Sequence, residues 1–264
     1  MKILTTSSKG IISVVVPTRN SSKHLEDCLK SLREQARKAD EIVVVFDSDK
    51  DANVSIARKL GTHIVLDSNG TIGSAYSAGA GAAKGDIVAF VDDDCIAPRD
   101  WLGKIEKEFM EDVDVVSGED VLPGKSSFFQ RAVYQIDKSR IMKNAVYGKR
   151  AKERLRGANI AYRKTVFEKE NFNPNLTGLQ EPEFNHRLFK KGFRMKFDPK
   201  LYVYHKRRNS LGEIFMQIFR NGKAKVELLK LHKDMVSFID VFPFLYIFFL
   251  LFMTYSAIRF GNLV

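Results

Sequence analysis

The stretch AFVDDDCIAP (residues 89–98) joins a strand-like segment directly to three consecutive acids. The apolar run at 87–91 is typical of a strand that is covered on both faces, and Asp92, Asp93 and Asp94 follow it without a spacer. Carboxylates this close repel one another, and burial raises the free energy of their charged forms. We therefore ask what makes three acids tolerable at the end of a strand.

The spacing of Asp92 and Asp94 indicates an answer. In an extended chain, alternate side chains lie on the same side, so these two carboxylates face one point while Asp93 points elsewhere and can cap the next segment. A hard divalent cation at that point would remove the repulsion and leave coordination positions for phosphate oxygens. A solvated acidic loop explains an isolated Asp-x-Asp equally well, so the choice depends on the rest of the chain.

The residues before this stretch alternate between strand-like and helix-like patterns. β-Branched runs at 11–20, 41–51, 62–67 and 86–91 alternate with helical patterns at 21–37, 54–61 and 71–85. This order predicts an α/β fold with a doubly wound, mostly parallel sheet. Because ligands bind beyond the carboxyl ends of the strands in such sheets, the acids of 47–51 and 92–94 are expected in the ligand site.

Beyond residue 100 the alternation is less regular. We expect helices at 101–112, 125–156, 181–192 and 211–233, and extended segments at 113–123, 159–164 and 193–208. Pro182 suits the first turn of helix 181–192 and Gly192 suits its end. The helix at 211–233 is amphipathic, with an apolar side that would carry Ile214, Phe215, Ile218, Phe219 and Leu228.

The composition is that of one large domain with a basic surface. The 264 residues are 44% hydrophobic and carry a net charge of +11, which suits phosphate-bearing ligands, nucleic acid or an anionic membrane. Nucleic acid is disfavoured because no recognised binding module accompanies the charge. Cys28 and Cys95 are too isolated for a disulfide scaffold or a zinc site and fit a reducing compartment. The segment before Ile11 is too short and too polar for a signal peptide.

The C-terminal segment differs in kind. Residues 241–258 contain no charged side chain, and their number lies at the lower edge of a bilayer-spanning helix. Lysines precede this run and Arg259 follows it. Basic residues that flank an apolar segment are typical of the cytoplasmic side of a membrane, as the positive-inside rule states. A membrane-associated segment is expected, and a buried core helix remains the alternative.

Five ordered segments give the chain a wider resemblance. ISVVVPTRN (12–20), EIVVVFDSDKD (41–51), GDIVAFVDDDC (85–95), RGANIAYRK (156–164) and the extended motif at 172–208 follow one another as in GT-A glycosyltransferases of family 2. The resemblance covers residues 11 to about 230. It implies a GT-A fold and an inverting enzyme that moves a sugar from a UDP- or GDP-linked donor, with Mn²⁺ or Mg²⁺ as cofactor.

The resemblance also assigns roles on the donor side. Pro17, Thr18 and Asn20 would line the nucleotide pocket, and Asp47 would hold the base or ribose. Its neighbour Phe46 stands where many relatives have another acid.

At the diphosphate, Asp92 and Asp94 would bind the metal, with Asp92 and Asp93 also contacting the nucleotide sugar. His205 resembles a histidine that completes the metal site in some relatives, and a neutral imidazole suits Mn²⁺ better than Mg²⁺. A hydrogen-bonded histidine at a strand end is an equally good interpretation of His205.

Two departures concern catalysis. Relatives commonly carry a Glu-Asp pair where this chain has Gln180 and Glu181, so the resemblance gives Glu181 the role of general base. Its carboxylate reaches one methylene farther and must still meet the acceptor hydroxyl within hydrogen-bond reach. Glu183 is the competing candidate. Many relatives also have an Arg-Asn pair at 78–79, and Arg207 or Arg208 would have to cover the missing charge.

We expect three regions: a catalytic domain at 1–210, an amphipathic interfacial helix at 211–234 and a hydrophobic membrane segment at 235–264. The amphipathic helix, the hydrophobic segment and the basic stretch at 138–156 together suggest a domain that lies on the cytoplasmic leaflet of a membrane. A lipid-linked or polysaccharide acceptor would suit that location. One alternative is a non-catalytic membrane protein that binds sugar nucleotides. Another is a sugar-nucleotide nucleotidylyltransferase, although its glycine-rich loop after the first strand is missing from VPTRNSS (16–22).

Overall fold

The computed structural model describes only part of the chain. The described residues are 10–18, 23–124, 126–128, 130–131, 134–135, 146–152, 155, 157–206, 210–235, 252–253 and 255–256. The chain divides into two units, Met1–Asn221 and Gly222–Val264. The predicted boundaries after residues 210 and 234 stay a prediction.

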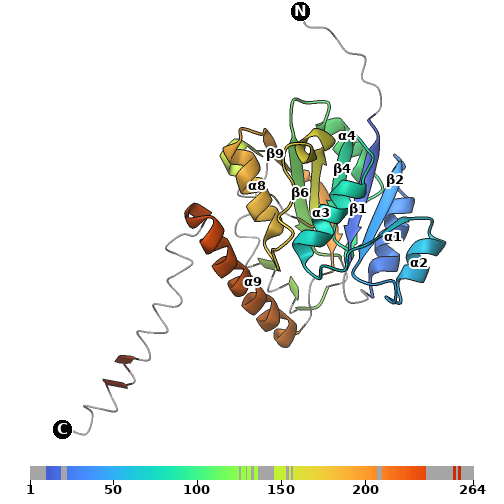
Figure 1. The fold of residues 1–264 in the computed structure, drawn as a ribbon. Coiled ribbons are helices and arrows are strands. Elements are labelled where there is room, and N and C mark those ends of the chain that lie inside the picture. Colours follow the sequence, from blue (N-terminus) through green and yellow to red (C-terminus); the bar gives the residue numbers. More distant parts are fainter. Residues whose placement is uncertain are drawn as a thin grey trace, which may run out of the picture. The chain divides into compact units, whose positions relative to one another are not determined.

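The first elements alternate as the sequence predicts (Figure 1). They are β1 (Ile12–Pro17), α1 (Leu25–Arg33), β2 (Glu41–Phe46), α2 (Val54–Lys59), β3 (His63–Leu66), α3 (Ile72–Ala82) and β4 (Ile87–Val91). β1 pairs in parallel with both β2 and β4, and β2 pairs in parallel with β3. The carboxyl ends of these strands therefore meet at one edge of the sheet.

The second half extends the same sheet. It contains β5 (Cys95–Ile96), α4 (Trp101–Glu108), β6 (Val115–Val121), β7 (Val146–Tyr147), α6 (Gly148–Lys152), β8 (Asn159–Arg163), α7 (Lys164–Phe167), α8 (Gln180–Lys190), β9 (Met195–His205), α9 (Leu211–Leu231) and a 3₁₀ turn (Lys233–Met235). The strand order is β3-β2-β1-β4-β8-β6-β9-β5, with β7 on β9. β8 runs antiparallel between β4 and β6, while β9 is parallel to β6. The prediction of a mostly parallel sheet is confirmed.

Apolar side chains cover both faces of the sheet, which makes the fold doubly wound. One core packs α1, α2 and α4 against the sheet through residues such as Leu29, Ala57 and Trp101. The other packs α3 and α8 through Tyr76, Phe184 and Leu188. Burial of these side chains supplies the main driving force for folding.

Two glycines end helices as the sequence indicates. Gly61 follows α2 with φ 66°, and Gly192 follows α8 with φ 81°. This left-handed backbone is unfavourable for residues with a Cβ atom, so glycine suits a position that must reverse the chain after a helix.

The region predicted as one helix at 125–156 is different where the structure describes it. Val146 and Tyr147 form β7 and pair antiparallel with Phe197 and Lys196 of β9, whereas 148–152 and the described positions 128, 130–131 and 134–135 are helical. Pairing with a strand edge that is distant in sequence overrides the local helical pattern here, as tertiary contacts commonly do.

Helix α9 is confirmed, but its side chains divide differently from the predicted apolar side. Leu228 and Ala224 are buried, whereas Phe215, Ile218 and Phe219 are exposed. Most of 235–264 lies outside the described residues, and within the described part of the chain no helix has the length and apolarity needed to cross a bilayer.

Candidate active site

A polar pocket lies where the carboxyl ends of β1 and β4 meet the start of α8. Its volume is about 530 Å³. The residues that line it include Pro17, Tyr76, Asp92, Asp93, Asp94, Gly157, Glu181, Gln217, Arg220 and Asn221. The parallel pairing of β1 with β4 brings Pro17 and residues 92–94 to one edge of the sheet, as the sequence predicts.

The charged form of Asp92 is disfavoured, as the sequence indicated for acids crowded at a buried strand end. Burial, together with the negative charge of Asp94, raises the pKa of the Asp92 carboxyl to about 8. One of its oxygens, Oδ1, accepts a hydrogen bond of 3.1 Å from the Tyr76 hydroxyl. Because the protonated form is favoured when no further cation is near, a bound cation would stabilise the ionised carboxylates of this cluster.

Sheet pairing places His205 beside the acids. β5 and β9 are antiparallel, and Cys95 lies opposite His205. His205 Nε2 is 3.2 Å from Asp94 Oδ1, and Nδ1 is 3.0 Å from Asp120 Oδ2. Burial lowers the pKa of His205, but hydrogen bonds to Asp120 and Asp94 outweigh burial and raise the pKa to about 10. Without another cation, an imidazolium therefore balances the charge of these carboxylates.

The same atoms fit a divalent cation. Two ligand atoms bound at about 2.1 Å and at a right angle are separated by about 3 Å, and the separation of His205 Nε2 and Asp94 Oδ1 is 3.2 Å. Metal binding requires His205 to lose the proton on Nε2. Cys95 belongs to the same cluster of candidate ligands. Burial raises the pKa of its thiol, and Mn²⁺ and Mg²⁺ prefer oxygen ligands to a soft thiolate.

Glu181 is held in the pocket by the start of α8 and by Gly157. A Cβ atom at position 157 would lie 1.7 Å from Glu181 Oε1, so only glycine leaves room for this carboxylate. Burial raises the pKa of Glu181, against a hydrogen bond from Tyr76 that lowers it. A raised pKa increases the proton affinity of a carboxylate, which suits a general base.

Glu183 has different surroundings. Its side chain is 2% exposed, and Arg187 binds both of its oxygens at 2.7 and 3.0 Å. It is absent from the described residues that line the pocket. The geometry supports Glu181 as the base and gives Glu183 a structural role in α8.

Sequence reasoning missed Tyr76, which connects the two halves of the site. Its hydroxyl contacts both Asp92 and Glu181, and its ring stacks on Phe90 with 4.9 Å between centroids. The signal in the sequence is weak: one large polar side chain within the small residues of α3.

Of the other residues predicted for the site, some line the pocket, some do not, and some lie outside the described residues. Pro17 and Asp93 line it. Thr18 is buried behind it, where its backbone N–H donates to Val45 O at 2.9 Å, and Asp47 follows β2 and is partly exposed. Asn20, Arg207 and Arg208 lie outside the described residues. Among the described residues that line the pocket, the cation is Arg220 of α9, which the sequence did not single out.

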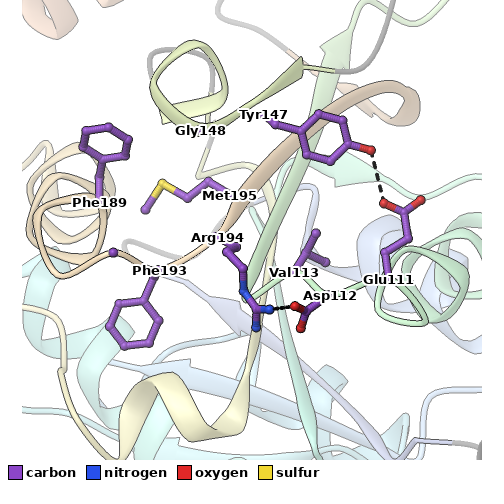
Figure 2. Close-up of a pocket in the computed structure, with 10 residues that line it drawn as sticks. Glu111, Asp112, Val113, Tyr147, Gly148, Phe189, Phe193, Arg194 and Met195 are labelled. Carbon is purple, nitrogen blue, oxygen red and sulfur yellow. Dashed lines mark hydrogen bonds and ion pairs between the residues drawn. The ribbon is translucent and has the colours of Figure 1, made fainter. Parts of the chain in front are cut away.

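A second cavity lies at the opposite end of the sheet, beside the amino ends of β6 and β9 (Figure 2). Its volume is about 400 Å³. Apolar groups of Phe189, Phe193 and Met195 face it, Arg194 pairs with Asp112, and the Tyr147 hydroxyl donates to Glu111 at 3.1 Å. An apolar cavity whose described charges are already paired is a poor site for a diphosphate, so the acidic pocket is the candidate.

Comparison with known proteins identifies the family of the chain. The model for Glycosyl transferase family 2 matches residues 13–170, more than half of the chain. Uncharacterized glycosyltransferase EpsJ of Bacillus subtilis is 27% identical over 226 residues, which cover 77% of this chain and 63% of EpsJ. Glycosyltransferase AglE of Haloferax volcanii is 25% identical over 249 residues, which cover 90% of this chain and 79% of AglE. The chain thus spans less than two thirds of EpsJ.

Solved structures share the fold. The mannosyltransferase PcManGT from Pyrobaculum calidifontis, in complex with GDP-Man and Mn²⁺, superposes with a TM-score of 0.67 at 19% identity, over 91% of this chain and 69% of PcManGT. S. aureus TarS 1-349 in complex with UDP-GlcNAc gives a TM-score of 0.62 at 23% identity, over 75% of this chain and 59% of that protein. At these identities the likeness shows the fold alone, which is GT-A-like as expected. The family model matches more than half of this chain, and the chain therefore belongs to glycosyl transferase family 2.

Proposed function

We propose that this protein transfers a sugar from a nucleoside diphosphate sugar to an acceptor, with inversion at the anomeric carbon. The observation that carries the proposal is the pocket that brings Asp92, Asp94 and Glu181 together, with His205 beside Asp94. In this pocket, the acids that could hold a cation lie near Glu181, a carboxylate whose pKa is raised by burial. These are the two groups that sugar transfer from a diphosphate donor requires.

The roles follow from the chemistry of the side chains. Asp92, Asp94 and His205 would hold Mn²⁺ or Mg²⁺, and Asp93 would contact the donor. When bound, the ion supplies positive charge next to the departing diphosphate. Glu181 accepts the proton of the acceptor hydroxyl, and the Tyr76 hydroxyl orients the carboxylates on either side of it. Arg220 adds a cation on the α9 side of the pocket.

The donor and the metal are proposed from the solved relatives and from the ligand set. One relative was solved with GDP-Man and Mn²⁺ and another with UDP-GlcNAc, so we propose a GDP- or UDP-linked sugar. Of the two metals, Mn²⁺ suits a site with an imidazole better than Mg²⁺ does. Pro17, Thr18, Asn20 and Asp47 are proposed to contact the nucleoside.

The acceptor is proposed to be lipid-linked or a polysaccharide, at the cytoplasmic side of a membrane. Support comes from α9, which presents Gln217, Arg220 and Asn221 to the pocket. On another side of the same helix, Phe215 and Phe219 are exposed. A helix with exposed apolar and basic side chains is suited to the interface of an anionic bilayer, where it would keep the pocket close to a lipid-linked substrate.

The test is a panel of UDP- and GDP-sugars incubated with the full chain and Mn²⁺, with release of nucleoside diphosphate as the readout. We expect release from at least one donor, and we expect Asp94→Ala to reduce the rate by a factor of about 10³, because a charge-stabilising group is lost. Glu34→Ala, which removes an exposed acid directly after α1, should leave the rate unchanged. Release by Asp94→Ala at the native rate would exclude the proposed metal site, and binding of a donor without transfer would favour a non-catalytic protein.

A further inference from the structure

Asp120 is a buried acid that sequence analysis did not connect with the pocket. It lies in β6, which is parallel to β9, and Asp120 is opposite Val203 in the register of the two strands. Since alternate residues of a strand share a face, His205 lies on the same face as Val203 and therefore on the face of Asp120.

A break in the strand register makes this placement possible. The pairing of β6 with β9 shifts between Ser117 and Glu119. At Gly118, between them, a Cβ atom would lie 1.5 Å from Leu201 O, so the two backbones approach there more closely than a side chain allows. Such a bulge re-aims the residues that follow it, and Asp120 lies two residues after Gly118.

The contact between Asp120 and His205 is specific to one ring nitrogen. Asp120 Oδ2 is 3.0 Å from Nδ1, whereas Nε2 is 3.2 Å from Asp94 on the pocket side. A carboxylate that accepts the Nδ1 proton fixes the tautomer in which Nε2 carries the lone pair. It also fixes the rotation of the ring, and therefore the direction in which that lone pair points.

We propose that Asp120 is a positioning residue that holds His205 as a metal ligand, by accepting a hydrogen bond from Nδ1 and directing Nε2 toward the cation at Asp94. The inference rests on the proposed function, because it concerns the same metal site. Asp120 does not touch the metal. Carboxylates in this second position alter metal affinity by a factor of about 10–100 in characterised sites.

A purely structural role for Asp120 predicts something different. If Asp120 only balanced the charge of a protonated His205, its removal would lower the stability of the fold and make the imidazole easier to deprotonate, so metal binding would stay the same or become tighter. A positioning role requires metal binding to weaken. The two roles therefore differ in the direction of the change in affinity.

The experiment titrates the full chain with Mn²⁺ alone and follows free Mn²⁺ by electron paramagnetic resonance. We expect Asp120→Ala to weaken binding by a factor of about 10–100. Asp120→Asn should keep most of the affinity, because the amide oxygen still accepts the Nδ1 proton. Thermal unfolding of each variant monitors the fold. With saturating Mg²⁺, which is diamagnetic and requires Nε2 to lose its proton, ¹⁵N chemical shifts of His205 should report an Nδ1–H tautomer in native protein and in Asp120→Asn but not in Asp120→Ala.

Asp114→Ala is the matched control, since it removes an acid that lies at the other end of β6 and pairs with Arg194. It should not change the affinity for Mn²⁺. Native affinity in Asp120→Ala, or equal losses in Asp120→Ala and Asp120→Asn, would overturn the inference while leaving the proposed function intact. If Asp94→Ala and His205→Ala also bound Mn²⁺ like the native chain, the metal site itself would be wrong and both proposals would fail.

Discussion

At the scale of single residues, the surroundings of Glu181 and Glu183 assign them opposite roles. Glu181 faces the pocket beside Gly157, and burial raises its pKa, whereas both oxygens of Glu183 are bound by Arg187. Glu181→Gln keeps the size of the side chain but cannot accept a proton. We expect folded protein that binds the donor and transfers sugar more slowly by a factor of about 10²–10⁴, measured as nucleoside diphosphate released in the presence of acceptor.

The companion variant Glu183→Gln should show the reverse pattern. Loss of the charge that binds Arg187 should destabilise the fold by about 2 kcal/mol, measured by urea denaturation, and should leave the transfer rate per folded molecule close to native. A Glu183→Gln protein that is stable but inactive, together with an active Glu181→Gln, would exchange the two assignments.

At the scale of elements, the pairing of β6 with β9 determines whether the site forms. Asn159 at the start of β8 joins these strands, because its Nδ2 donates to Glu119 O at 3.0 Å and to Leu201 O at 2.9 Å, and its Oδ1 accepts from Trp101 Nε1 at 2.9 Å. Gly118 permits the close approach at the same point. Both residues act through the backbone of the strands that carry Asp120 and His205.

Gly118→Ala should therefore disrupt this pairing. The added methyl group would meet Leu201 O at 1.5 Å, and because this atom belongs to the backbone, the strands must separate. We expect a loss of about 3 kcal/mol or more in the free energy of unfolding, measured by urea denaturation. Gly124→Ala, where no atom lies within 4 Å of the added methyl, should change that free energy by less than about 0.5 kcal/mol. Equal stabilities of the two variants would show that the β6–β9 approach does not need glycine.

At the scale of the whole molecule, the net charge of +11 and the exposed side chains of α9 bear on the proposed membrane location. Phe215 and Phe219 are 67% and 63% exposed, and lysines such as Lys223 and Lys230 follow on the same helix. Apolar contact and electrostatic attraction would act together at an anionic surface, and salt would weaken the electrostatic part.

We expect the full chain to sediment with vesicles that contain phosphatidylglycerol more than with neutral vesicles, and less so at high salt. Replacement of both Phe215 and Phe219 by Ser should weaken vesicle binding by a factor of about 100 or more, because each ring loses a contact worth about 1.5 kcal/mol or more. Leu66→Ser removes a side chain of β3 that is 55% exposed and serves as the control. Since all variants keep residues 235–264, that segment contributes equally; unchanged binding by the double variant would exclude α9 as the contact.

The sequence by itself determined the first half of the sheet and the location of the acids. Strands β1 to β4 are short, mostly apolar runs with local stop signals, so their order along the chain and their common carboxyl edge follow from patterns within a few residues of each strand. The same patterns placed Asp92 and Asp94, and the family resemblance added Glu181; the structure brings all three to one pocket. His205 was recognised through motif order, and the contact with Asp94 follows from the pairing of β5 with β9.

Only the tertiary structure decided what surrounds those residues. Tyr76, Asp120 and Arg220 reach the site from α3, β6 and α9, and Glu183 is separated from Glu181 by its pairing with Arg187. These contacts join segments far apart in the chain, and the one between Asp120 and His205 depends on a register shift at Gly118. Local sequence patterns specify which residues form a strand, but the register and neighbours of that strand depend on packing across the whole sheet, which a single sequence does not display.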